Sequence, residues 1–345
     1  MKSALLIGAG GIGNAYAARF FSHVADRARI GAVCDIVPAA RDALGDRLGL
    51  PPQRRYADAR TAIADADADF CLITTQPWYH LEPLLEACAA GLPVLMEKPI
   101  TSELDQLAPM AKAVAESGIR CQVVQNYRYT KRMLRFRDLL REGRVGRLQY
   151  VQARFADDYR AYGSWGGPNP FRHEMDDPMV LDGSIHHLDM LRYLTGGDPQ
   201  QVYGSAFNPA WSSFKGHSAG LYVIEFDNDT RAAYEANLQS AGEPNSWYRE
   251  YYRAECEDGA ITSVDGDTIV VTRAGAVEEE IPVGEDPRQG HARVLEQFLN
   301  WLERDIEPEC TFADNLKSVA LMFAARATGH SRRAVSVGEF LPGPN

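Results

Sequence analysis

Several features are missing from this sequence of 345 residues, and each absence excludes a class of protein. No apolar run approaches the ~18 residues that a membrane-spanning helix needs, so no membrane association is expected. Acidic residues outnumber basic ones, 47 against 36, and the net charge of −11 argues against binding to nucleic acids or anionic lipid surfaces. We find no internal repeat, low-complexity tract or signal-peptide pattern, and therefore expect a folded protein of the cytoplasm.

Cysteine is also sparse. The six cysteines are Cys34, Cys71, Cys88, Cys121, Cys256 and Cys310, with no C-x-x-C pair among them. Cys34, Cys71 and Cys121 lie in or beside apolar runs. We expect buried free thiols in a reducing compartment, with neither disulfides nor a zinc site built on cysteine.

A glycine-rich segment near the N-terminus carries the most specific signal. The apolar run Ala4–Ile7 leads into Gly8-Ala9-Gly10-Gly11-Ile12-Gly13, which fits G-x-G-x-x-G, and a helical stretch follows. Such a unit binds a pyrophosphate at the turn and the helix N-terminus. A second strand-like run ends at Asp35, which follows Gly13 by 22 residues, close to the ~20 expected of a ribose-binding acid. The two features predict a dinucleotide site, with NAD favoured over NADP because a carboxylate would repel a 2′-phosphate.

The order of apolar runs predicts two domains. Strand-like runs alternating with helical stretches are found at 4–7, 30–34, 70–74, 93–96 and 119–124. Strand-like runs without convincing helices between them follow at 201–207, 220–226, 230–238, 251–256, 260–264, 268–272 and 277–281. The predicted fold is α/β, with a Rossmann domain at 1–122 and an α+β domain with a large, mostly antiparallel open sheet at 123–345. The C-terminal helix is expected to pack back on the first domain.

Polar residues follow the third and fourth strand-like runs, where ligands of doubly wound folds bind. Thr74, Thr75 and His80 follow one run, and Glu97-Lys98 follows the next. The Lys98 ammonium could stabilise charge on a substrate oxygen, although a surface ion pair with Glu97 is the alternative. For His80, a helix-capping or surface position is a simpler interpretation than contact with a cofactor.

Asp182, His186 and Asp189 are spaced four and three residues apart in a predicted helix over 183–194. On a regular helix they share one face. A histidine oriented by a carboxylate suits general acid–base catalysis near neutral pH, while a buried structural histidine is an equal alternative. The nearby acids and histidines match no zinc spacing, so no metal is predicted. His187, about 100° further around the helix, is expected to point away.

In order and spacing, these segments resemble the glucose–fructose oxidoreductase/inositol dehydrogenase (Gfo/Idh/MocA) family over essentially the whole chain. The matching segments are Gly8–Gly13, Thr75 to His80, Glu97-Lys98-Pro99, Asn126-Tyr127-Arg128 and Asp182…His186…Asp189. The resemblance implies a Rossmann domain followed by an open-sheet domain. It also implies NAD or NADP as cofactor and hydride transfer at a ring carbon of a sugar, cyclitol or related polyol.

By this resemblance Lys98, Asp182 and His186 take the catalytic positions, and Asn126 and Asp189 take substrate-side positions. Tyr127 and Arg128 lie beside Asn126 on the substrate side. Contact with the cofactor is assigned to Gly8, Gly10, Gly11, Ile12, Gly13, Asp35, Thr74, Thr75, His80, Glu97 and Lys98.

Two positions depart from the family pattern. Ser184 stands where the family often has glycine, and Gln76-Pro77 replaces a frequent Pro-Asn. The loop 157–178 has no counterpart that we can match. Its aromatic residues, Tyr159 and Trp165 among them, are mixed with charges and suit stacking on a sugar ring. An oligomer contact or a lid is equally consistent with that loop.

The sequence thus predicts an NAD-dependent dehydrogenase of a cyclic polyol. His186 takes the hydroxyl proton, Lys98 polarises the oxygen, and Asp182 holds the tautomer of His186. Two alternatives stay open: a glycoside-cleaving enzyme that oxidises its substrate transiently and keeps its NAD, and a non-enzymatic sugar- or nucleotide-sensing regulator. The expected partners are a small carbohydrate or cyclitol and further copies of the chain. An uncovered sheet face predicts a homodimer or homotetramer.

Overall fold

The computed structural model describes residues 1–165, 170–242, 244–264, 266–284, 286 and 288–343. Contacts between residues divide the chain into two units. The first unit comprises Met1–Asn126, Pro287–Leu316 and Pro342–Asn345, and the second comprises Tyr127–Asp286 and Lys317–Leu341. The first unit therefore includes a segment from late in the chain, and its N-terminal part extends to Asn126, four residues beyond the boundary expected from the sequence.

The first unit is built on a parallel sheet of six strands in the order β3-β2-β1-β4-β5-β6. The strands are β1 (Lys2–Ile7), β2 (Ala28–Cys34), β3 (Arg55–Tyr56), β4 (Phe70–Ile73), β5 (Val94–Met96) and β6 (Cys121–Val123). This is the Rossmann strand order, which reverses between β1 and β4 and places a binding crevice beyond their carboxyl ends. The predicted strands are confirmed, and the two-residue β3 adds a strand that no apolar run indicates.

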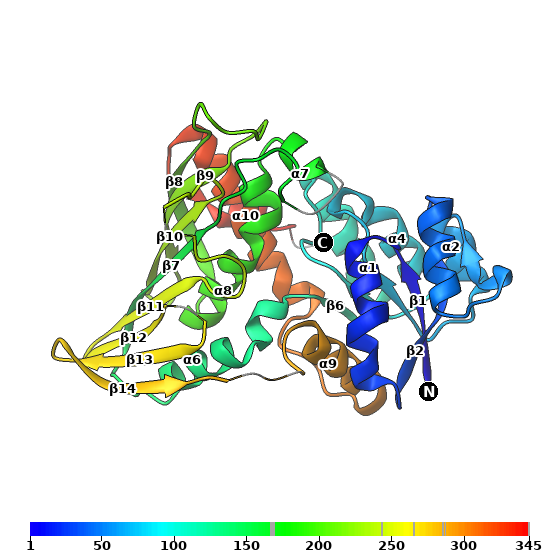
Figure 1. Cartoon of the computed structure of the whole chain (residues 1–345), viewed down its shortest axis with the longest axis horizontal. Coiled ribbons are helices and arrows are strands. Elements are labelled where there is room, and N and C mark those ends of the chain that lie inside the picture. The colour runs from blue at the N-terminus through cyan, green and yellow to red at the C-terminus, as the bar shows by residue number, and fades with distance from the viewer. Residues whose placement is uncertain (166–169, 243, 265, 285, 287, 344–345) are drawn as a thin grey trace. The chain divides into compact units, whose positions relative to one another are not determined.

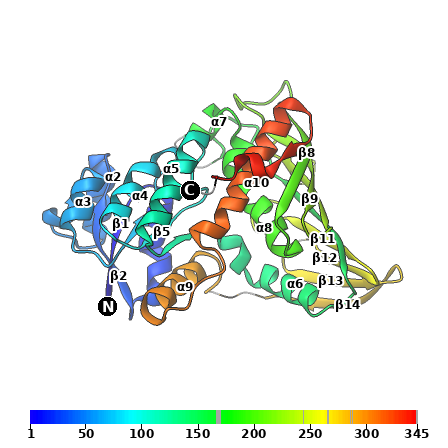
Figure 2. The ribbon, with the colours of Figure 1, turned by 180° about the vertical axis from the view of Figure 1, so that it is seen from behind.

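Helices cover both faces of this sheet. They are α1 (Gly11–Ala15), α2 (Pro38–Arg47), α3 (Ala59–Asp65), α4 (Leu81–Ala89), α5 (Leu104–Ser117) and α9 (His291–Arg304). Helices α3, α4 and α5 lie side by side on one face (Figure 2), and α1 lies on the other (Figure 1). Because both faces are covered, every residue of β4 is buried, which explains its unbroken apolar sequence.

The second unit contains a sheet of nine strands in the order β14-β13-β12-β11-β7-β10-β9-β8-β15. The strands are β7 (Leu148–Ala156), β8 (Pro199–Phe207), β9 (Ala219–Phe226), β10 (Arg231–Asn237), β11 (Tyr251–Cys256), β12 (Gly259–Ser263), β13 (Thr268–Arg273), β14 (Ala276–Pro282) and β15 (Val335–Ser336). Among the described strand pairs of this sheet only β7–β10 is parallel, so the predicted mostly antiparallel sheet is confirmed.

Helices α6 (Lys131–Arg141), α8 (Ile185–Thr195) and α10 (Phe312–Ser331) of this unit pack on one face of the nine-stranded sheet (Figures 1 and 2). The unit also contains the short helix α7 (Phe171–Glu174), and α10 enters the unit at Lys317. Every residue of α8 is buried, which is typical of a helix packed on all sides.

The opposite face presents apolar side chains to solvent. Tyr203 is 54% exposed, Leu221 is 56% exposed and Val223 is 49% exposed, while the alternate residues of the same strands are buried. Tyr203 and Val223 are directly paired across β8 and β9 and share this face.

All six cysteines are free thiols in the structure, and all except Cys256 are buried. Burial raises the pKa of the Cys34 thiol to about 12. Among the residues that the structure describes, no helix is long and apolar enough to cross a membrane.

Candidate functional site

The glycine turn between β1 and α1 has the geometry that its motif predicts. Gly8 has a φ of +107°, and a Cβ there would lie 2.8 Å from the backbone of Thr74. A Cβ on Gly13 would lie 2.1 Å from the carbonyl oxygen of Gly8, so helix and strand meet backbone to backbone. A Cβ on Gly10 or Gly11 would have no described atom within 4 Å. These two glycines therefore leave a space where a pyrophosphate can approach the backbone.

Asp35 follows β2, and its carboxylate is held beside the glycine turn. The N–H of Ala9 donates to Oδ2 at 2.6 Å, and the N–H of Val37 donates to Oδ1 at 2.8 Å. Arg41, the first cation after Asp35 in the sequence, binds Asp42 at 2.9 Å. A 2′-phosphate at this position would meet an oriented carboxylate.

Two threonines, Thr74 and Thr75, directly follow β4. The Thr74 hydroxyl donates to the carbonyl oxygen of Gly8 at 2.7 Å and so fixes the glycine turn to the neighbouring strand. The Thr75 hydroxyl oxygen is buried and has no hydrogen-bond partner among the described residues. Such an unsatisfied buried group favours a polar ligand at this point.

His80 is fully buried between two turns of the crevice edge. Its Nδ1 lies 3.1 Å from the carbonyl oxygen of Ile100, and its Nε2 lies 3.0 Å from that of Thr75. Burial lowers the pKa of His80, although both backbone contacts oppose that effect. The imidazole therefore connects the turn after β4 to the turn after β5.

Glu97 and Lys98 follow β5. Glu97 is buried, with Oε1 at 3.5 Å from Nε2 of His291. His291 in turn stacks on Phe20 at 4.7 Å between ring centroids. Lys98 is half-buried, and its peptide bond to Pro99 is cis. His291 lies far from the motif in sequence, so no local pattern predicts its place beside Glu97.

In the second unit, Asp182 and His186 lie on either side of a break in helical geometry. Residues Met179–Gly183 form a π-helical turn, in which the N–H of Ser184 donates to the carbonyl oxygen of Met179 at 2.7 Å. Helix α8 begins at Ile185. The prediction of a regular helix that begins at residue 183 is therefore wrong. The α-helix begins two residues later, and Asp182 belongs to the wider π-helical turn before it. Turns of this kind are frequent at functional sites.

Aromatic rings surround His186. It stacks on Tyr127 at 4.5 Å between ring centroids and meets Trp247 edge to face at 6.1 Å. Tyr127 stacks in turn on Tyr248 at 4.7 Å. Burial raises the pKa of the Tyr127 phenol well above its usual value. His186 is 9% exposed, so its imidazole lies largely out of water against apolar ring faces.

The Asp182 carboxylate accepts a hydrogen bond from Nε of Arg172. The guanidinium of Arg172 also lies 5.1 Å from the ring centroid of Trp165. Trp165 is stacked on Tyr159 at 5.6 Å, and the Tyr159 hydroxyl accepts from the indole N–H of Trp247 at 2.7 Å. The predicted loop residues Tyr159 and Trp165 thus join Asp182 and His186 in one aromatic cluster through Arg172 and Trp247.

Asn126, Arg128 and Asp189 are almost completely buried. Arg128 binds Asp189 through two hydrogen bonds of 2.6 Å each, and Ser318 donates to the same carboxylate at 2.6 Å. Asn126 opens the short 3₁₀ turn Asn126–Tyr129. Two residues assigned to the substrate by resemblance are therefore paired with each other, an arrangement that positions α8.

His187 points into the core of its unit. Its Nδ1 lies 2.7 Å from the Tyr234 hydroxyl, and its Nε2 lies 3.4 Å from Glu250. Glu250 also binds Arg132 at 3.0 Å. Burial alone would raise the pKa of Glu250, but the hydrogen bond from His187 and the nearby positive charges hold it below its usual value. Tyr234 also donates to Ser184, which gives that departure from the family pattern a structural role.

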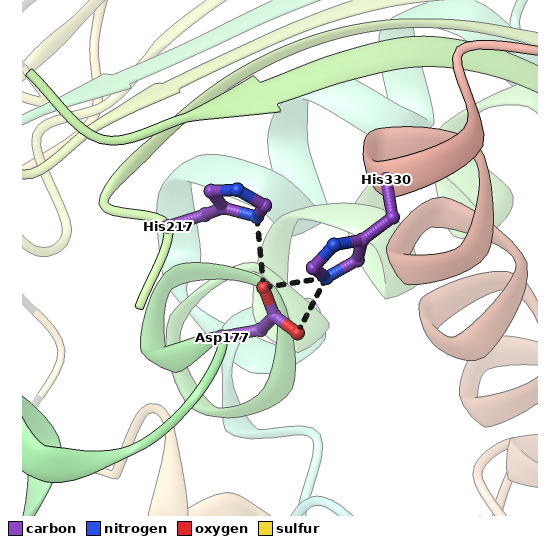
Figure 3. A group of neighbouring side chains, drawn as sticks. All are labelled: Asp177, His217 and His330. Atoms are coloured by element: carbon purple, nitrogen blue, oxygen red, sulfur yellow. Dashed lines mark hydrogen bonds and ion pairs between the residues drawn. The ribbon is translucent and has the colours of Figure 1, made fainter. Parts of the chain in front are cut away.

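The described residues contain one group of side chains arranged to ligate a metal ion: Asp177, His217 and His330 (Figure 3). Only Asp177 comes from the acidic and histidine-rich stretch noted in the sequence. Neither His186 nor His187 belongs to the group.

Comparison with known proteins agrees with this architecture. Residues 2–125 match a family described as "Oxidoreductase family, NAD-binding Rossmann fold", and residues 133–262 match the GFO/IDH/MocA C-terminal domain. An uncharacterized protein of Sinorhizobium fredii, y4oX, is 32% identical, over 98% of this chain and 96% of its own length.

More distant similarities cover the chain as fully. The inositol 2-dehydrogenase of Rhizobium meliloti is 24% identical over 96% of this chain and 98% of its own. A crystal structure of an oxidoreductase from Agrobacterium radiobacter, in complex with NAD⁺, L-tartaric acid and magnesium, superimposes with a TM-score of 0.85 at 22% identity, covering 99% of both chains. The chain is a member of the Gfo/Idh/MocA family of NAD-binding oxidoreductases.

Proposed function

We propose that this protein moves a hydride between NAD and a ring carbon of a sugar, an inositol or a related cyclic polyol. The observation that carries the proposal is His186, an imidazole stacked on Tyr127 and flanked by Trp247, with Asp182 in the turn before it. Aromatic faces are suited to the C–H faces of a sugar ring. The similarity to inositol 2-dehydrogenase supports the same substrate class.

The residues present fit the cofactor. Gly10 and Gly11 provide the open backbone for the pyrophosphate, Asp35 provides the ribose acceptor, and the unsatisfied Thr75 hydroxyl provides a donor. When bound, NAD supplies the redox chemistry by accepting the two electrons of the carbinol as hydride. The chain's own residues supply position and proton transfer.

In the direction of oxidation, we propose that His186 accepts the proton of the substrate hydroxyl. The C–H bond of the carbon that bears this hydroxyl breaks at the same time, and its hydrogen leaves as the hydride that NAD accepts. Lys98 hydrogen-bonds the substrate oxygen and stabilises the charge that develops on it. Asp182 orients the imidazole, and Arg172 holds that carboxylate. His80 positions Lys98 through its contact with Ile100 and remains itself out of the reaction.

The proposal is tested by screening purified protein with NAD against inositols, aldoses and glycosides, with NADH absorbance as the readout. Oxidation of a cyclic polyol with stoichiometric NADH formation is the expected result. If the protein retains its cofactor and cleaves glycosides without added NAD, the proposed dehydrogenase is replaced by a glycoside-cleaving enzyme that oxidises its substrate transiently. Binding of a sugar with no turnover of any compound would replace the proposed dehydrogenase with a sensor.

Cofactor choice is the first prediction. We expect kcat/KM to be at least about tenfold higher with NAD than with NADP, because Asp35 accepts from the ribose and repels a 2′-phosphate. Asp35→Ser should lower kcat/KM for NAD about 10- to 100-fold, because that factor is equivalent to one hydrogen bond to a charged group. The same substitution should reduce the preference for NAD over NADP. Asp65→Ser on the exposed surface of α3 is the control. Equal or better use of NADP by the wild-type protein would contradict the prediction.

The second prediction concerns the assembly of several copies of the chain. We propose a homodimer or homotetramer that buries the sheet face bearing Tyr203, Leu221 and Val223, since large apolar faces on folded proteins usually meet a partner. Leu221→Glu places a charge in that interface and should shift the mass in light scattering toward the single-chain 38.2 kDa. Ile306→Glu, at an equally exposed apolar residue off the sheet, should leave it unchanged. A wild-type mass of one chain at micromolar concentration would contradict the proposal.

A further inference from the structure

Three side chains distant in sequence converge in the second unit: Asp177 before the π-helical turn, His217 before β9, and His330 near the end of α10 (Figure 3). His217 Nδ1 lies 3.0 Å from Oδ1 of Asp177. His330 Nε2 lies 3.0 Å from the same oxygen and 2.9 Å from Oδ2. The two imidazole rings are 4.5 Å apart between centroids. None of the three residues takes part in the proposed hydride transfer.

We propose that Asp177, His217 and His330 form a binding site for one divalent transition-metal ion of the zinc type. Two imidazole nitrogens and one carboxylate oxygen are a ligand set that zinc accepts in proteins, with a further position for water. Magnesium and calcium prefer sites built from oxygen atoms, so two imidazoles disfavour them.

The geometry of the donor atoms supports this assignment. All three lie within 4.8 Å of one another. In a tetrahedral zinc site with metal–ligand distances of about 2.0–2.1 Å, ligand atoms are about 3.3 Å apart. Oδ1 of Asp177 lies 3.0 Å from Nδ1 of His217 and 3.0 Å from Nε2 of His330, and both distances are close to that value. An ion can therefore enter with small side-chain rotations.

The surroundings hold the carboxylate in place. Arg326, one helical turn before His330 on α10, donates to Oδ2 of Asp177 at 2.7 Å, which leaves Oδ1 for the ion. Partners of this kind orient metal ligands in known sites. The positive charge of Arg326 also repels a cation, so we expect weaker affinity than in a site without it. The nearby Lys215 is neutralised by Asp176 at 3.1 Å.

Backbone contacts preorganise two of the three ligands. The N–H of His217 donates to the carbonyl oxygen of Asp176 at 3.2 Å, and a Cβ on Gly216 would lie 1.5 Å from that oxygen. The segments bearing Asp177 and His217 are therefore in direct backbone contact. His330 supplies the route of entry, because its side chain is 53% exposed whereas that of Asp177 is 2% exposed.

The test is equilibrium binding of zinc to chelator-treated full-length protein, followed by calorimetry and metal analysis. We expect one zinc ion per chain and a higher unfolding temperature with zinc than without. His217→Gln and His330→Gln should each weaken binding by more than about tenfold, since removal of even outer-shell partners costs about 10–100-fold. Both should also abolish the thermal shift. Magnesium should not compete.

His23→Gln, a half-buried histidine outside the group, is the matched control and should bind zinc like the wild type. Cobalt(II) provides a second readout, because a tetrahedral spectrum should form in the wild-type protein and be lost in His330→Gln, which retains a polar side chain. Equal zinc affinity in wild-type and both glutamine variants, or no uptake at all, overturns the proposal and makes the group a hydrogen-bonded clamp.

Discussion

Turnover is expected to fall by ~10²–10⁴ in Lys98→Ala and in His186→Asn, the range typical of a lost acid–base group. In Lys98→Ala the loss should lie at the upper end, because charge stabilisation of the substrate oxygen is lost as well. In His186→Asn, kcat should fall more than KM rises, since proton transfer acts mainly on the transition state. Steady-state kinetics on the substrate found by the screen measure both effects, and circular dichroism with NAD titration checks that fold and cofactor binding survive.

Lys112→Ala is the matched control for Lys98, because Lys112 forms an exposed ion pair with Glu116 on α5. His187 is a poor control for His186: its contacts with Tyr234 and Glu250 predict a loss of stability when it is replaced. Wild-type kcat in both Lys98→Ala and His186→Asn would remove the proposed catalytic roles.

Stability should respond most to Asp189. Asp189→Leu leaves the Arg128 guanidinium, whose side chain is 4% exposed, without its carboxylate. Breaking a buried pair in this way typically costs about 3–5 kcal/mol. We expect a loss of that size in the free energy of unfolding, measured by chemical denaturation at fixed protein concentration.

The double variant Arg128→Met/Asp189→Leu should recover part of the loss, because no unpaired charge is then buried. Arg147→Ala, in an exposed ion pair with Glu257, should leave the midpoint of denaturation unchanged. A higher KM for the polyol with unchanged stability in Asp189→Leu would instead support the substrate-side role implied by family resemblance.

Contiguous motifs account for what the sequence could predict. Gly8 and Gly13 are required by the backbone geometry of the turn, because a Cβ at either position would collide with backbone atoms. Asp35 follows within the same β1–α1–β2 unit, and its carboxylate accepts a hydrogen bond from the N–H of Ala9 in the turn. Strands of the second unit alternate between buried and exposed residues, as in β9. The same alternation of apolar and polar residues in the sequence therefore predicts them as strands. The two-residue strands β3 and β15 are too short to show any period.

The side chains that surround the candidate site could not be predicted from local sequence patterns. Trp247 and Tyr248 reach the His186 cluster from a segment about 60 residues further along the chain, and no pattern connects them to it. The π-helical turn that carries Asp182 spans Met179–Gly183, and no sequence pattern in that segment distinguishes a π-helical turn from an ordinary α-helical one. The histidines that join Asp177 are also remote in sequence, because His217 follows it by 40 residues and His330 by 153.

The return of residues Pro287–Leu316 to the first unit has a consequence for biosynthesis. Phe298 packs against Phe70 of β4 at 5.3 Å, Glu303 binds Arg27 at 2.8 Å, and Thr311 forms a bridge to Gln122 at the edge of the sheet. A ribosome adding about 5–20 residues per second needs roughly 8–32 s to pass from Asn126 to Pro287. During that interval the nascent Rossmann sheet has apolar side chains and a strand edge that lack their final cover. The protein is thus expected to engage chaperones early, and a truncation that removes residues 287–316 should damage the N-terminal nucleotide fold.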